Sequence, residues 1–184
     1  MISIPQDNEP LPVTISVARR LTLRKAEKLR HKSLVDTLFR EGNSTYVYPL
    51  RLVWRVMTTE MLESSFRNGV PPRIGPLQML ITIPKKKRRR AVDRVLMRRR
   101  IREAYRLGRE PLRVWLSAHP ECRSLQMGFI YLADKNLDYK TISRKMELLI
   151  QKMLTSASQQ AIVSVSQLPA EPQRNSDANS VQPL

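Results

Sequence analysis

The chain has 184 residues, of which 33 are Lys or Arg and 16 are Asp or Glu, so its formal net charge is +17. Such an imbalance repels itself in a folded domain and calls for a polyanionic partner, either nucleic acid or an anionic membrane surface. No run of about 18 apolar residues is present to span a membrane, and no secretory signal is expected at the N-terminus. The single cysteine excludes an internal disulfide framework and a zinc site built on several cysteines, and it favours a cytoplasmic location.

Composition divides the chain into three predicted segments. Residues 1–20 contain three prolines and little periodicity, which predicts a flexible N-terminal extension. Residues 155–184 contain one arginine, no lysine and no aromatic residue, and this composition predicts a disordered C-terminal tail. The run AIVSV at 161–165 is the one stretch of that tail with an alternative reading as a strand. Residues 21–154 remain as one domain of ordinary size.

The first half of this domain predicts a helix and a strand. Residues 25–40 indicate a basic helix that ends before Gly42. Its apolar residues share one face: Leu34, Val35, Leu38 and Phe39. Residues 46–57 are rich in Val, Tyr and Trp and predict a strand. Residues 58–76 contain two glycines and three prolines, which predicts a loop.

The second half predicts a strand over 77–83, a helix over 91–107 closed by Gly108, a strand over 127–133 and a helix over 138–154. The resulting order is helix, strand, strand, basic helix, strand, helix. It predicts an α+β fold (an α/β sandwich), in which the helices pack on one face of a small sheet.

The segment 85–106 is the most informative, because 12 of its 22 residues are Lys or Arg and only 2 are acidic. Six consecutive basic residues come first: Lys85, Lys86, Lys87, Arg88, Arg89 and Arg90. At 100° per residue, one side of the following helix then carries arginines: Arg94, Arg98, Arg102 and Arg106, with Arg99 at the edge. Leu96, Met97 and Ile101 fall on the opposite side, where we expect them to pack.

Guanidinium groups at this spacing suit RNA. They bind phosphates through two parallel hydrogen bonds and stack on bases. Residues at i and i+4 lie about 5–6 Å apart, close to the separation of successive phosphates. A merely solvated charged face and a nuclear-localisation segment are the alternatives. A solvated face does not account for the large uncompensated net charge. A nuclear-localisation segment does not explain why the basic run continues into a periodic helix.

The stretch from Pro84 to Arg106 reads PKKKRRRAVDRVLMRRRIREAYR, and it closely resembles the central motif of the bacterial ribonuclease P protein component, in the form found in Bacteroidetes. The family pattern is Lys-Lys, a spacer, Ala-Val, and then Arg-Asn-Arg-x-Lys-Arg-x-x-Arg-Glu. The resemblance covers about 21–154: residues 29–42 are similar to the first helix of the family, 48–54 to its first strand, and 128–154 to its final strand and helix.

Carried over residue by residue, the motif places Arg94 at its first arginine, Arg98 at its lysine, Arg99 at the next arginine and Arg102 before Glu103. The chain departs from the motif in the middle. Val95 stands where the family has asparagine, and Leu96 where it has arginine. Any polar contact or metal-linked role of that asparagine is therefore not expected here.

The resemblance implies a ribosomal-protein-like fold, with a mixed four-stranded sheet and a left-handed β-α-β crossover. It implies that the protein binds the RNA subunit of ribonuclease P, which carries the catalytic Mg²⁺ ions. It also implies a cleft between the first helix and the sheet that holds the 5′ leader of precursor tRNA, with Phe39 at its aromatic position, Val35 one turn earlier and Trp54 on the strand.

The residues themselves give no catalytic site within the protein, because the carboxylates are scattered and no phosphate-binding loop is present. His31, His119 and Cys122 have no partner pattern. We therefore expect no catalytic residue, no cofactor or metal bound by the protein alone, and no protein partner or membrane. Two functions remain: a ribonuclease P subunit that assists cleavage, or a basic ribosomal-type protein that binds RNA without a role in cleavage. A membrane-surface role comes third, since the basic helix lacks Trp and Phe.

Overall fold

The computed structural model describes residues 22–165, with side chains placed as far as residue 159. Four strands form one mixed sheet in the order β1-β2-β4-β3. The strands are β1 (Asn43–Val47), β2 (Leu50–Met57), β3 (Leu77–Thr82) and β4 (Ser124–Tyr131). The helices are α1 (Lys32–Glu41), α2 (Thr59–Ser64), α3 (Ala91–Gly108), α4 (Glu110–Ser117) and α5 (Tyr139–Val165), and a 3-10 turn, η1, spans Lys25–Glu27. The predicted α+β fold with a small mixed four-stranded sheet is confirmed.

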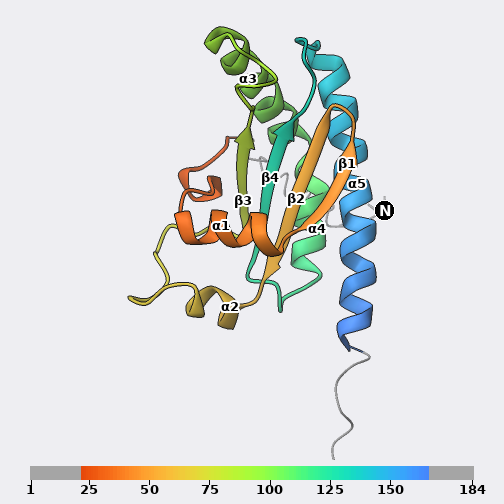
Figure 1. Cartoon of the computed structure of the whole chain (residues 1–184). Helices are drawn as coiled ribbons and strands as arrows, with labels where there is room; N and C mark the ends of the chain where they lie inside the picture. Colours follow the sequence, from red (N-terminus) through yellow and green to blue (C-terminus); the bar gives the residue numbers. More distant parts are fainter. Residues whose placement is uncertain (1–21, 166–184) are drawn as a thin grey trace, which may run out of the picture.

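The connection between β3 and β4 is a left-handed crossover. The two strands are parallel neighbours, and α3 and α4 lie between them in the sequence. In Figure 1 both arrows point upward, with β4 to the right of β3, and α3 and α4 run behind the sheet. Seen from the helices, β4 therefore lies to the left of β3. This handedness is rare, because strand twist favours the opposite one, and it agrees with the expectation from the resemblance.

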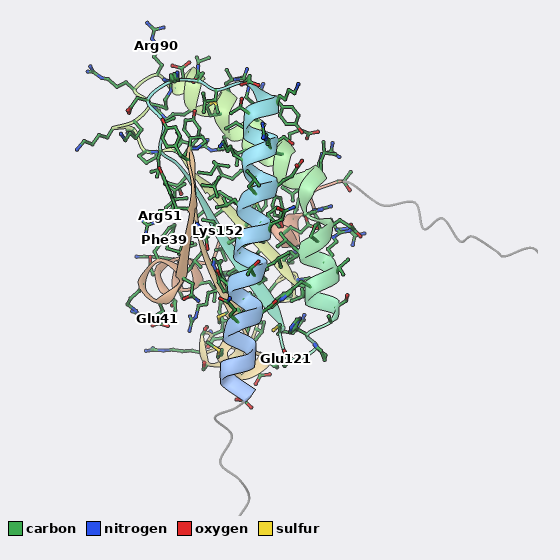
Figure 2. The ribbon with its side chains drawn as sticks, turned by 90° about the vertical axis from the view of Figure 1, so that its right-hand side faces the viewer. Phe39, Glu41, Arg51, Arg90, Glu121 and Lys152 are labelled. Atoms are coloured by element: carbon green, nitrogen blue, oxygen red, sulfur yellow. The ribbon has the colours of Figure 1, made fainter. Side chains whose placement is uncertain are left out.

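Helices cover both faces of the sheet, so the expectation that they pack on one face is wrong. Helices α3, α4 and α5 lie on one face and α1 crosses the other (Figures 1 and 2). The alternation along β2 accounts for this, since Trp54 joins the larger core under α3 and α5 while Val53 and Met57 join a smaller core under α1. A strand that is apolar on both faces needs a cover on each.

The larger core fixes the orientation of α3. Its buried side chains are Met97, Ile101, Ala104 and Tyr105, at the spacing of one helical face. The buried side chains of α5 that share this core are Ile142, Met146, Leu149, Ile150 and Met153. Arg98, Arg99 and Arg102 lie outside this buried set.

The first half of the domain contains more and shorter secondary-structure elements than its sequence predicts. The strand predicted over 46–57 is two antiparallel strands, β1 and β2, which turn at the cis Tyr48–Pro49 bond. The helix predicted over 25–40 begins only at Lys32, because the preceding residues run along the edge of β3, where Lys28 bridges to Met79. The loop predicted over 58–76 contains α2, whose first turn is capped by Thr58.

The end of α5 also differs from the prediction. The composition predicts disorder from residue 155, with a strand at 161–165 as the alternative, yet α5 continues to Val165. Ala157 is buried, four residues after Met153, so the apolar stripe of α5 extends beyond the last large side chain. The predicted N-terminal extension and the rest of the predicted tail lie outside the described residues.

A buried ion pair ties the start of the described chain to α4. Arg109, at the N-cap of α4, donates from Nη1 to Glu27 and from Nη2 to the carbonyl oxygen of Thr22, at 3.0 Å in the latter case. The Arg109 and Glu27 side chains are 3% and 9% exposed. A charge left alone in such a site is costly, whereas an apolar pair of similar size is tolerated.

We therefore expect Arg109→Met to lower the free energy of unfolding by about 3–5 kcal/mol, measured by urea denaturation. The double variant Arg109→Met/Glu27→Leu should recover most of that loss. Arg40→Met, which breaks an exposed pair with Glu41, is the control and should change stability little. A single Arg109 variant as stable as this control would contradict the importance of the buried pair.

Candidate RNA-binding surface

The basic run before α3 divides into structural and exposed residues. Arg88 pairs with Asp93 at 2.8 Å and also bonds Asn136 and the carbonyl oxygen of Asp134. Lys87 reaches Asp134 at 3.2 Å. These contacts attach the run to the loop between β4 and α5. The Arg88 side chain is only 12% exposed, and these partners give it a structural role, while its expected contact with RNA stays a prediction.

The arginines of α3 divide in the same way. Arg94 is half-buried and donates to the carbonyl oxygens of Arg88 and Arg89, which closes the loop onto the first turns of the helix. Arg106 pairs with Glu103, and this hydrogen bond lowers the pKa of Glu103 and raises that of Arg106. Arg100 bonds the carbonyl oxygen of Leu137. Three arginines of α3 remain, and they are Arg98, Arg99 and Arg102.

Seven basic side chains form what we call the cationic surface: Lys85, Lys86, Arg89, Arg90, Arg98, Arg99 and Arg102. No hydrogen bond or ion pair to any residue of 22–165 engages these side chains. All are exposed except Arg98, which is half-buried. Arg90 lies at the outer end of the molecule in Figure 2, just before α3 begins. Seven unpartnered cations on one helix and its leading loop make a strong site for a polyanion.

Apolar side chains are interspersed with these cations. Val92 is 78% exposed, Val95 43% and Leu96 36%. The expectation that Leu96 packs on the core side of α3 is wrong, because the buried positions centre on Met97 and Ile101 and leave Leu96 at the solvent margin. The two departures from the family motif thus place exposed apolar groups beside the arginines.

The other candidate surface lies beside α1. Phe39 is 43% exposed and rests on β4 over Gly128, where a Cβ atom would come within 3.2 Å of its ring. Glycine at that position therefore lets the ring lie against the strand. Val35, one turn earlier, is half-buried and packs against the smaller core. Phe39 is therefore available at the surface of this face, whereas Val35 is taken up by packing.

Trp54 does not belong to this surface, and its assignment to the cleft is wrong. It is 1% exposed, lies in the larger core on the other face, and donates to Thr45 at 3.2 Å. The strand aromatic on the α1 side is Tyr46, which is 49% exposed and directly opposite Arg51. Arg51 and Phe39 project from the same side of the molecule in Figure 2. Neither Tyr46 nor Arg51 was identified from the sequence, because their face is defined only once the β1–β2 hairpin is known.

The remaining reactive side chains are engaged in packing. His119 stacks on Trp115 with the ring centres 4.3 Å apart, and His31 meets Phe66 edge to face. Burial and the neighbouring Glu121 raise the pKa of Cys122 to about 11. Within 22–165, no three His, Cys, Asp or Glu side chains come together as a metal site. No helix of the same region is both long and apolar enough to cross a membrane.

Comparison with known proteins shows the class of protein to which this chain belongs. The family model described as Ribonuclease P matches residues 23–154. The ribonuclease P protein components of two Porphyromonas gingivalis strains are each 33% identical over 125 residues, which is 68% of this chain and 81% of the relative. The chain therefore belongs to the ribonuclease P protein family.

Solved structures of two bacterial ribonuclease P proteins are also similar. The Staphylococcus aureus protein is 15% identical with a TM-score of 0.47, and the match covers 70% of this chain and 96% of that one. The Thermotoga maritima protein is 18% identical with a TM-score of 0.44, over 67% of this chain and 94% of that one.

Proposed function

We propose that this chain is the protein subunit of ribonuclease P, and that it assists removal of the 5′ leader from precursor tRNA. The observation that carries the proposal is the cationic surface. Its seven basic side chains have no partners among the described residues. Membership in the ribonuclease P family supports the RNA subunit of that enzyme as the polyanion that this surface binds.

The cationic surface would bind the RNA subunit mainly through its phosphates. Arg98 and Arg102 are four residues apart on α3, about 5–6 Å between neighbouring positions, which suits successive phosphates of one strand. Lys85 and Lys86 extend the surface beyond the N-terminus of the helix, where the helix dipole also favours anions. Binding of this kind releases counterions, so its affinity falls steeply as salt rises.

In this proposal the RNA subunit performs the hydrolysis with its own Mg²⁺ ions, and the protein supplies binding and position. Several carboxylates of the described chain are already paired with arginines: Glu27, Glu41, Asp93 and Glu103. The proposal includes a cytoplasmic location, and the single free thiol, Cys122, supports it.

The α1 side of the sheet is proposed as the site of the 5′ leader. Phe39 and Tyr46 are exposed aromatic rings on which unpaired bases can stack. Arg51 lies between strand and solvent on the same face, held by a hydrogen bond from its Nε to Ser44 at 2.9 Å. Arg51 is exposed, so its guanidinium group can bind a phosphate of the leader.

The proposed function is tested by cleavage of precursor tRNA with the RNA subunit at low magnesium, a condition in which added wild-type protein should stimulate cleavage. We expect Arg98→Glu/Arg102→Glu to abolish most of this stimulation. The same variant should weaken binding of the RNA subunit and reduce the slope of log affinity against log salt by about 2, one for each lost phosphate contact.

Arg144→Glu/Lys152→Glu is the matched control, because it makes the same change in net charge at exposed positions of α5. It should leave the salt slope close to that of the wild type. If the wild-type protein fails to stimulate its cognate RNA subunit, the proposal is wrong, and the alternative of a ribosomal-type RNA-binding protein gains support.

Phe39→Ala should weaken binding of precursor tRNA to the reconstituted enzyme by roughly 5- to 100-fold, the loss expected for one stacked base. Binding of mature tRNA, which lacks the leader, should stay the same. The affinities are compared by titration of both substrates. Leu148→Ala is the control, since Leu148 on α5 is exposed to nearly the same degree, 44% against 43%. An equal loss for both tRNAs would argue against a leader contact at Phe39.

A further inference from the structure

A small pocket lies between the two surfaces described above. It has a volume of about 260 Å³ and opens at the outer edge of β3, between residues 28–30 and α3. β3 is an edge strand of the sheet (Figure 1). The pocket is several times larger than the roughly 30 Å³ of one water and smaller than the 300–1,000 Å³ of sites for drug-sized ligands. Its size suits one planar ring system.

The floor of the pocket is apolar. Leu23, Met79 and Ile81 line it, and each also packs with the larger core. Leu29, which is 3% exposed, closes one wall. A floor of this kind gives a bare phosphate ion nothing to bind, but it offers a flat apolar contact to a ring.

The rim of the pocket is cationic. Arg98 and Arg102 come from α3, and Lys28 and Arg30 come from the segment before α1. No hydrogen bond or ion pair within the described residues occupies these four side chains. Four unpartnered cations around an apolar floor select a ligand that is flat and apolar at one end and anionic at the other.

The edge of β3 adds backbone N–H and C=O groups that can form hydrogen bonds with such a ligand. The carbonyl oxygen of Met79 accepts from the N–H of Leu29 at 3.0 Å, so the backbone groups of Met79 point outward from the sheet. Residues two apart in a strand point the same way, so the N–H and C=O of Ile81 also face outward. The covering segment leaves the strand at His31, where it turns into α1, and does not continue the pairing to Ile81.

We propose that this pocket takes one unstacked nucleobase of the bound RNA. The base rests on Leu23, Met79 and Ile81, its edge bonds the outward backbone groups of Ile81, and its flanking phosphates lie on the four cations of the rim. This inference rests on the proposed function, because that function makes RNA the partner. The pocket would recognise a base, whereas the rest of the cationic surface binds the RNA backbone. It also connects the cationic surface to the α1 side.

The test uses the full chain labelled with ¹⁵N and adenosine 5′-monophosphate as the probe, with ribose 5-phosphate as the probe that lacks a base. We expect the nucleotide at millimolar concentration to shift the amide resonances of residues 23–30 and 79–82, above all that of Ile81. Ribose 5-phosphate should leave Ile81 unmoved. Equal shifts from both probes, or shifts from the nucleotide confined to the surroundings of Phe39, would overturn the proposal.

Two variants test the pocket itself. Leu23→Trp fills the floor without changing charge and should abolish the shift of Ile81, while Arg30→Gln removes one rim cation without touching the core and should weaken nucleotide binding several-fold. Leu148→Trp places the same large ring at an exposed position of α5 and should bind the nucleotide like the wild type. The dispersion of the same spectra shows whether each variant is folded. A folded Leu23→Trp that retains the shift of Ile81 contradicts the pocket.

Affinity for the RNA subunit separates this proposal from the proposed function. Leu23→Trp should bind the RNA subunit roughly 5- to 100-fold more weakly than the wild type, the effect of losing one base contact, with an unchanged salt slope. If the wild type binds the RNA subunit and the nucleotide does not enter the pocket, only the pocket is refuted. If the wild type does not bind the RNA subunit at all, the proposed function itself fails.

Discussion

The packing of α3 against the sheet and α5 is the interaction on which the rest of the molecule depends. Met97, Ile101, Ala104 and Tyr105 are fully or almost fully buried, and they fix the rotation of the helix about its axis. That rotation decides which arginines face solvent and which turn back to the chain. A helix with this many like charges would be unstable alone, because its cations repel one another. Burial of one apolar face allows the opposite face to stay charged and ordered.

Positive charge does two different jobs in this protein. Arg88, Arg94 and Arg100 satisfy carbonyl and carboxylate oxygens around the N-terminal half of α3. Arg88 and Arg100 attach that half to the loop that follows β4, and Arg94 attaches the basic run to the helix. Their neighbours on the cationic surface have no such partners among the described residues and remain available to a polyanion. The same division recurs at Arg109, which is buried with Glu27 and serves the fold alone. The net charge therefore overstates the number of basic side chains that are available for binding. The contacts of each side chain show which ones are available.

The residues predicted the long, periodic elements well and the short, contact-dependent ones poorly. Helix α3 was expected over 91–107 and spans Ala91–Gly108, because its stripe of Met97, Ile101 and Ala104 is strong in the sequence itself. The hairpin at Tyr48–Pro49 was missed, since the turn lies among residues that favour strands and contains no glycine or asparagine. Without the hairpin, the two faces of the strand cannot be told apart, so Trp54 is predicted for the side on which Tyr46 is the exposed aromatic. The structural role of Arg88 could not be predicted either, because its partner Asn136 is distant in sequence.

We propose that the solvent face of α3, fixed by this packing, is the RNA interface. The most direct measurement places a photo-crosslinking amino acid at Val92, which is 78% exposed at the start of α3, or at Val114, which is 62% exposed on α4. After irradiation of each protein with the RNA subunit, covalent protein–RNA product is quantified. An RNA interface on α3 predicts strong crosslinking from position 92 and little from position 114. Crosslinking from position 114 that equals or exceeds that from position 92 would contradict it.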